Sequence, residues 1–278
     1  MANTTSSSGV VWIDKMAVDV RGEGDDVVFI HGLGGSMNAW TPLLPVLGAY
    51  RCIRIELPGS ARSHKAYAMA DSAPAGGQLS MDVFADAVVR VCQVLGVRQA
   101  HFVGHSMGTI VCQHIAVNQP SLVRSLALLG ALAEPYPDMR TGMTQRAATA
   151  RTEGMFGIAE GISAFALSAS SQETQPVTVA YVREGVAAQN AEGFARNCTA
   201  LANAQAARAE LIRCPALLVS GDEDQVTPLH GARALAAKLG GGQTDVRVEA
   251  LSRCGHWPML ERTADCQRLL RDFLARVR

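Results

Sequence analysis

The sequence predicts an α/β fold in which a mostly parallel central sheet is flanked by helices and carries an inserted helical cap. Three observations predict this fold. Apolar runs typical of buried strands alternate with helical patterns, glycine-containing polar segments follow these runs, and one long stretch has helical patterns without a convincing strand. Strands that alternate with helices form mostly parallel sheets, because the crossover helices cover both faces of the sheet.

Eight strands are expected along the chain, and the first two, at residues 10–14 and 16–20, are expected to form an antiparallel start. The other six are expected at residues 25–32, 50–59, 99–104, 123–130, 214–221 and 244–251. Apolar residues at helical spacing predict helices near residues 37–48, 79–95, 107–118, 228–239 and 262–276.

The segment 132–211 interrupts this alternation of strands and helices. It is rich in alanine, carries polar residues at helical spacing and is punctuated by glycine and proline. We therefore expect residues 9–131 and 212–278 to form the α/β core and residues 132–211 to form a helical cap inserted into it. Residues 1–8 are polar and are expected to be disordered.

The composition indicates an ordinary globular chain with one large core. Of the 278 residues, 48% are hydrophobic, and the 25 basic and 25 acidic residues leave no formal net charge. This balance favours neither nucleic acid nor an anionic membrane as a partner. The sequence begins without a signal-peptide pattern and has no apolar run of about 18 residues. Seven cysteines without a CxxC spacing indicate free thiols and a cytoplasmic location.

A serine flanked by two glycines lies in the segment HFVGHSMGTI, between a predicted strand and a predicted helix. Gly104, Ser106 and Gly108 match the pattern G-x-S-x-G, in which a sharp strand-to-helix turn exposes the serine hydroxyl. Side chains at the two glycine positions would collide with the neighbouring strand and helix. Ser106 is therefore the candidate nucleophile, and the helix after it directs amide groups and a positive dipole end toward the site.

A serine nucleophile needs a base, and His256 follows the last predicted strand in the segment GHWP. The base in turn needs an acid that fixes its tautomer. Asp224 is the candidate acid, because it lies in the segment GDED where the loop has cleared the end of a strand. Asp222 and Glu223 in the same segment also fit solvated loop charges, and Glu134 after an earlier strand is a rival acid.

Two backbone N–H groups are expected to bind the oxyanion that forms when the serine attacks a carbonyl group. One belongs to Met107, directly after the nucleophile, and the other to Leu33 in the segment HGLGG. The glycines of that segment let the loop approach closely. His105 adjoins the nucleophile and is expected to point away from it.

The segments HGLGG, GHSMG, GDEDQVTP and CGHWPMLE resemble the four signatures of the α/β-hydrolase superfamily, in the same order and over nearly the whole chain. This resemblance implies the α/β-hydrolase fold, a triad in the chain order Ser, Asp, His, and chemistry without a cofactor or metal. The cap segments RTEGMFGIAEGISAFALSAS and NAEGFARNCTALANAQ are similar to the cap of the bacterial 3-oxoadipate enol-lactonases.

Two departures from the enol-lactonase pattern bear on the substrate. The cap segment EGISAFALSASSQETQ, residues 160–175, contains no Arg or Lys that could bind a substrate carboxylate. The turn ELPGSARS has Glu56 in place of the usual aspartate, and its Arg62 is the nearest substitute cation, although a structural role suits it better. We therefore expect neutral esters or lactones to be preferred, with Phe165 and Trp257 as substrate contacts and Phe156 as a further candidate in the cap.

These observations predict a serine hydrolase that cleaves a carboxylic ester or lactone through an acyl-enzyme on Ser106, with a small molecule as its partner. A C–C bond hydrolase of ring-cleavage products, a 3-oxoadipate enol-lactonase proper and an acyltransferase are the enzyme alternatives. A hydrolase-fold ligand receptor is the non-enzyme alternative, because one fold supports many functions. The sequence carries no signal for a particular oligomeric state.

Overall fold

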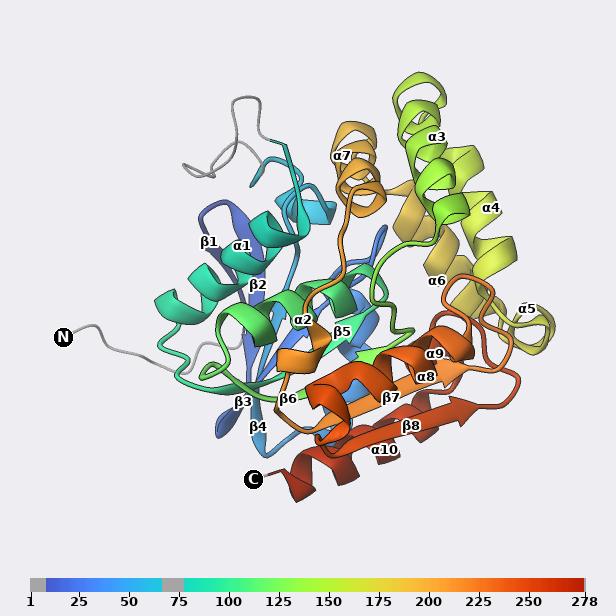
Figure 1. Cartoon of the computed structure of the whole chain (residues 1–278). Helices are drawn as coiled ribbons and strands as arrows, with labels where there is room; N and C mark the ends of the chain where they lie inside the picture. Colours follow the sequence, from blue (N-terminus) through green and yellow to red (C-terminus); the bar gives the residue numbers. More distant parts are fainter. Residues whose placement is uncertain (1–8, 67–77, 278) are drawn as a thin grey trace.

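The computed structural model describes residues 9–66 and 78–277, and its eight strands form one sheet (Figure 1). The strand order is β1-β2-β4-β3-β5-β6-β7-β8. The strands are β1 (Gly9–Ile13), β2 (Met16–Arg21), β3 (Asp25–Ile30), β4 (Tyr50–Ile55), β5 (Ala100–His105), β6 (Val123–Leu129), β7 (Ala216–Gly221) and β8 (Val246–Leu251). Strand β2 pairs antiparallel with β1 and β4, and all other neighbours pair parallel. The predicted α/β class is confirmed, while the expectation for residues 1–8 lies outside the described residues.

Helices cover both faces of the sheet, as the buried strand patterns require. The core helices are α1 (Met81–Val94), α2 (Met107–Asn118), α8 (Leu229–Lys238), α9 (Pro258–Glu261) and α10 (Thr263–Arg276). Alternate residues of β3 enter different clusters: Val28 and Ile30 pack in the cluster with α1, α2 and α8, and Val27 and Phe29 in the cluster with α10. This period of two arises because successive strand side chains point to opposite faces.

One predicted helix has a different form. The segment expected as a helix at residues 37–48 is the 3₁₀ segment η1 (Met37–Val46), which contains Pro42 and Pro45. Proline lacks the N–H that an α-helical hydrogen bond needs, and its ring clashes with the carbonyl group four residues earlier. The shorter segments η2 (Ala61–Ser63), η4 (Ala209–Leu211) and η5 (Leu239–Gly242) lie in connections.

Five helices lie between β6 and β7 in the chain, and Figure 1 shows them grouped together in green to gold. They are α3 (Pro137–Glu153), α4 (Phe156–Ala166), α5 (Ala169–Thr174), α6 (Pro176–Ala187) and α7 (Ala191–Ala202). They fall within the segment 132–211 that is expected as an insertion, and we call them the cap. Within the described parts of the chain, no helix combines the length and apolar character needed to cross a membrane.

Candidate active site

Ser106 lies at the turn between β5 and α2 with a backbone conformation that side chains rarely adopt, at φ 51° and ψ −120°. The turn is tight enough to exclude side chains at both flanking positions. A Cβ atom added to Gly104 would lie 2.7 Å from the Gly108 carbonyl oxygen, and one added to Gly108 would overlap the carbonyl oxygen of Ile30. The strain at Ser106 and the two glycines therefore belong to one local arrangement, which presents the serine at the carboxyl end of the central strand β5.

The glycine-rich loop after β3 lies directly against Ser106, the candidate nucleophile. A Cβ atom added to Gly32 would lie 2.9 Å from the Cβ of Ser106, so the loop passes close to the serine side chain. Leu33 follows in this loop and lines the same cavity as Ser106. Met107 is the first residue of α2, where backbone N–H groups have no partner within the helix. The two expected oxyanion donors thus belong to segments on either side of Ser106.

His256 and Asp224 form a buried pair, with 2.9 Å between the Nδ1 of the histidine and Oδ2 of the aspartate. Asp224 Oδ1 accepts hydrogen bonds of 2.8 Å from the backbone N–H groups of Val226 and Thr227, and the Thr227 hydroxyl donates to Oδ2 at 2.8 Å. Burial opposes ionisation of Asp224, but the nearby His256 ring and the bonds from Thr227 outweigh it and lower the pKa of the carboxyl group. The aspartate is therefore ionised and held in one orientation.

The other acids considered from the sequence have different partners. Asp222 accepts the backbone N–H of Cys254 at 3.2 Å, and Glu223 accepts the backbone N–H of Ala169 at 2.9 Å. Glu134 pairs with an arginine of α3 at 2.8 Å and is 47% exposed. Asp222 and Glu223 therefore fix loops, while Asp224 is the acid that bonds the histidine.

The ring of His105, a residue expected from the sequence to point away from Ser106, packs against His256 and Trp257. Its ring centre lies 4.8 Å from that of His256 and 4.7 Å from that of Trp257, and it lines the cavity. Its Nε2 lies 2.7 Å from the carbonyl oxygen of His256, so Nε2 carries the proton and donates it. Burial, reinforced by the neighbouring His256, lowers the pKa of His105 to about 3, so the ring is neutral near pH 7. His105 therefore holds the main chain of the base.

A buried carboxylate, Glu261, organises the loop around His256 and was missed by the sequence reasoning. Its Oε1 accepts the backbone N–H of Trp257 at 3.0 Å, and its Oε2 accepts those of Gly255 at 3.0 Å and Ser168 at 2.8 Å. The two loop residues flank the base in sequence, and Ser168 belongs to the cap. The only sequence signal was the glutamate at the end of CGHWPMLE.

The cap also bonds directly to the base and to the glycine-rich loop. The backbone N–H of His256 donates to the carbonyl oxygen of Ala166 at 2.7 Å. At the other end of the cap, Gln189 donates from Nε2 to the Gly34 carbonyl oxygen at 3.2 Å and accepts the Ala61 backbone N–H at 2.8 Å. Three of the four segments that carry candidate catalytic groups are therefore hydrogen-bonded to the cap: the glycine-rich loop, the His256 loop and, through Glu223, the Asp224 loop.

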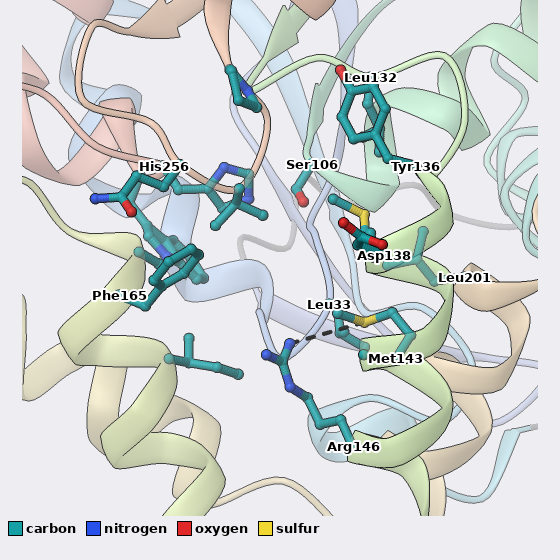
Figure 2. A pocket seen from close by; sticks show the side chains of 18 of the residues that line it. Leu33, Ser106, Leu132, Tyr136, Asp138, Met143, Arg146, Phe165, Leu201 and His256 are labelled. Carbon is teal, nitrogen blue, oxygen red and sulfur yellow. Dashed lines mark hydrogen bonds between the residues drawn. The ribbon is translucent and has the colours of Figure 1, made fainter.

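A cavity of about 680 Å³ opens between the core and the cap, and Figure 2 shows Ser106 and His256 facing it. Phe165 and Trp257, the expected substrate contacts, both line the cavity. Phe156 is 72% exposed and is not among the lining residues. The volume suits a small organic molecule, and most of the wall is apolar.

Charges in the cavity differ from those considered in the sequence. Arg62 is not among the lining residues, because its guanidinium pairs with the buried carboxylate of Glu56 at 2.7 Å. Arg146 of α3 does line the cavity, and so does Asp138 at the start of the same helix. The cation of the cavity thus comes from α3, outside the segment 160–175 whose lack of Arg and Lys led to the expectation of a neutral substrate. Among the described residues, no cluster of histidine, cysteine or acidic side chains could hold a metal ion.

Comparisons with known proteins identify the family of the chain and proteins of similar sequence. A family model described as the alpha/beta hydrolase fold matches residues 26–263. The chain is 28% identical to a 2-hydroxymuconate semialdehyde hydrolase of Pseudomonas sp. (strain CF600), over 91% of this chain and 88% of the relative. It is 24% identical to a 2-hydroxy-6-oxononadienedioate/2-hydroxy-6-oxononatrienedioate hydrolase of a Pseudomonas species, over 93% of this chain and 91% of the relative.

Solved structures show the same fold at lower identity. An esterase from Thermogutta terrifontis matches with a TM-score of 0.85 and 22% identity, covering 97% of this chain and 99% of that one. An enol-lactonase from Burkholderia xenovorans LB400 matches with a TM-score of 0.82 and 24% identity, covering 96% of this chain and all of that one (100%). At these identities the likeness concerns the arrangement of the backbone.

Proposed function

The chain belongs to the alpha/beta hydrolase family, and on that premise we propose that it is a serine hydrolase that cleaves a carboxylic ester or lactone. The observation that carries the proposal is the meeting of two independent features at one cavity. Ser106 occupies a strained turn at the cavity wall, and His256 lines the same wall with its Nδ1 bonded to the ionised Asp224. This combination suits nucleophilic catalysis by a hydroxyl group.

In the proposed acylation step, Ser106 Oγ attacks the carbonyl carbon while His256 Nε2 accepts the hydroxyl proton. Asp224 accepts the Nδ1–H bond, which leaves Nε2 free as the base and stabilises the imidazolium that forms. The N–H groups of Met107 and Leu33 bind the developing oxyanion. Collapse of the tetrahedral intermediate breaks the bond to the alcohol oxygen, which takes the proton from His256, and the acyl group stays on Ser106.

In the proposed deacylation step, His256 takes a proton from water, and the resulting hydroxide attacks the acyl-enzyme carbonyl carbon. The bond to Ser106 Oγ then breaks, the serine regains the proton from His256, and the carboxylic acid leaves. No cofactor enters this sequence. In a lactone the alcohol and the acid belong to one molecule, so a single ring-opened product forms. The seven free cysteines, six of them buried, suit a reducing cytoplasm as the place of action.

A C–C bond hydrolase is the second candidate, and two relatives named as hydrolases of 2-hydroxymuconate semialdehyde and of 2-hydroxy-6-oxononadienedioate favour it. In that reaction the bond that breaks joins the carbonyl carbon to a carbon atom, and the leaving group is a stabilised carbanion that must be protonated. The ester reaction needs no such proton donor beyond His256. The two candidate reactions use the same nucleophile and the same base, and they differ in the leaving group and in how it is protonated.

A substrate panel tests the proposal and separates it from the second candidate. We would measure kcat/KM for aryl esters, aliphatic lactones and a ring-cleavage dienoate, with Ser106→Ala as the background control. The proposal expects the esters or lactones to be turned over faster than the dienoate, with the rate lost in Ser106→Ala. A strong preference for the dienoate would replace the proposal by the second candidate. Equal rates in the wild type and in Ser106→Ala would show that Ser106 is the nucleophile of neither reaction.

A further inference from the structure

We propose that Arg146 is the anion-binding residue of the cavity and that the preferred substrate carries a carboxylate group. This inference rests on the proposed function, because it names the substrate class for the same site. Arg146 lines the cavity together with Ser106 and His256 and is half-buried in its wall. Figure 2 shows its side chain extending from α3 with the guanidinium in the cavity.

The Arg146 guanidinium has no acidic partner within the described residues. Its one hydrogen-bond contact runs from Nη1 to the Sδ of Met143 at 3.9 Å, and a thioether is a weak acceptor. None of the ion pairs among residues 9–66 and 78–277 includes it. The other arginines of this helix differ, since Arg140 and Arg151 each pair with a glutamate at 2.8 Å. Arg146 alone on α3 therefore presents its charge to the cavity.

The position of Arg146 on the helix follows from the spacing along α3. Met139, Gly142, Met143 and Arg146 all line the cavity, and their spacings of three and four residues put them on one face of the helix. Rotation of the helix would turn Met139 and Met143 out of the cavity together with Arg146. The helix therefore keeps the guanidinium directed at the cavity.

The surroundings make an anion favourable at this point. A guanidinium that is half-buried among apolar groups loses part of its hydration and has five N–H donors to satisfy. A carboxylate can accept two of them in parallel, with the geometry that arginine matches best. One cation in an otherwise apolar region suits one negative charge, whereas a phosphate dianion would need further donors. A carboxylate is therefore the ligand class that fits.

A second charge on the same helix makes the two ends of the cavity electrostatically different. Asp138 lines the cavity eight residues before Arg146, which corresponds to about 12 Å along the helix axis. Asp138 is exposed, as are the neighbouring lining residues Tyr136 and His230, so that end faces solvent. A substrate carboxylate is repelled at the Asp138 end and attracted at the Arg146 end. This polarity reverses the expectation of a neutral substrate that was drawn from residues 160–175.

Matched ester pairs test the inference. One pair is an aryl hemi-ester of glutaric acid and the aryl ester of pentanoic acid, which have acyl chains of the same length. The other pair places the carboxylate on the leaving group, as the pentanoate ester of 3-hydroxybenzoic acid against that of phenol. We expect the anionic member of at least one pair to have the higher kcat/KM in the wild-type protein.

Substitution of the arginine then identifies the source of the preference. Arg146→Met keeps the apolar stem and should lower kcat/KM for the preferred anionic ester on the order of 10- to 100-fold, while the neutral ester changes by no more than about 2-fold. Arg146→Lys should keep part of the preference. Arg151→Met is the matched control, because Arg151 pairs with Glu192 and does not line the cavity. It should leave the anionic-to-neutral ratio unchanged.

A binding measurement separates this inference from the proposed function. Calorimetry with pentanoate, which cannot be hydrolysed, reports anion binding whether or not Ser106 is a nucleophile. Tighter binding to the wild type and Arg151→Met than to Arg146→Met supports the inference even if no ester is turned over. Equal binding to the three proteins would overturn it. So would the absence of an anionic preference in both ester pairs, or an equal loss on anionic and neutral esters in Arg146→Met.

Discussion

The α4–α5 turn and helix α3 belong to the same cap but contact the active site differently: the turn through hydrogen bonds to its loops, and α3 through side chains that line the cavity. The turn consists of residues 167–168, and its backbone and that of the residues beside it bond to the core. The Ala166 carbonyl oxygen and the Ser168 N–H bond to the loop of His256. The Ala169 N–H bonds to the loop of Asp224. Helix α3 instead presents side chains to the cavity, and its Arg140 donates to the carbonyl oxygen of Ala202 within the cap.

The difference teaches which part of the cap can vary without disturbing the chemistry. The backbone bonds at the turn fix the position of His256, and the Ser168 hydroxyl adds one side-chain bond of 2.8 Å to the carbonyl oxygen of Arg253. Side chains on α3 touch the ligand space without holding a catalytic group. Changes at the turn's partners should therefore alter the rate on every substrate, and changes on α3 should alter the choice among substrates.

The largest effect is expected on the acid that the core supplies. Asp224→Asn should lower kcat on the order of 10³- to 10⁴-fold on every substrate, because the amide favours the wrong tautomer of His256. Steady-state kinetics with an aryl ester measures this. Asp222→Asn and Glu134→Gln serve as controls and should cost far less, since neither bonds the histidine. If Glu134→Gln instead caused the large loss of kcat, the catalytic acid would lie in the segment that carries the cap and not in the core.

The next effect concerns Glu261, which joins the turn to the base loop. Glu261→Gln replaces one acceptor oxygen by an NH₂ group that faces backbone N–H donors, so the loop around His256 should shift. We expect kcat to fall about 10- to 100-fold with KM little changed and with the anionic-to-neutral ratio preserved. Hydrogen exchange should become faster at the N–H groups of Ser168, Gly255 and Trp257.

This variant and Arg146→Met together form a sharp contrast between the two regions. Glu261→Gln should change the rate without changing selectivity, and Arg146→Met should change selectivity without changing the rate on neutral esters. A loss of selectivity in Glu261→Gln, with normal kcat on neutral esters, would show that the turn and α3 do not act separately.

A smaller effect is expected from His105, which supports the base from the core side. Its folded pKa of about 3 lies below the ordinary value of 6.5, so the unfolded chain binds more protons between these values. Stability contributed by the neutral ring is therefore present above pH 6.5 and is lost as the pH falls toward 3. For His105→Gln, the loss of unfolding free energy from pH 8 to pH 5 should be smaller by about 2 kcal/mol. Urea unfolding at both pH values measures it, and an unchanged pH dependence would mean that folding does not lower the pKa of His105.

The smallest effect is expected from the apolar wall that α4 adds to the cavity. Phe165 lines the cavity and is 52% exposed, so Phe165→Ala should shift the preferred acyl length by about 2- to 5-fold in relative kcat/KM. Phe156→Ala is the control, because Phe156 is on the outside of the cap. An equal loss on all esters with a lowered melting temperature would instead assign Phe165 to the packing of the cap.

Features that depend on local sequence were predictable, and features that depend on packing were not. The spacing of Gly104, Ser106 and Gly108 reports a steric requirement within one turn, and the structure has that turn. Strands and core helices follow from local periodicity, except that two prolines change the form of residues 37–46. The approach of Arg146 to Ser106 depends on how α3 lies over the sheet, which no local pattern records. The ring of His105 is directed by its bond to His256, a residue far away in the chain.

The most direct test of the central claim is covalent trapping of the nucleophile. A phosphonate ester that mimics the tetrahedral intermediate would be incubated with the protein, and the modified peptide would be located by mass spectrometry. We expect one adduct, on Ser106, formed at a rate that falls in step with kcat in Asp224→Asn and accompanied by loss of all ester turnover. An adduct on a different residue, or full turnover by protein whose Ser106 is modified, would contradict the account.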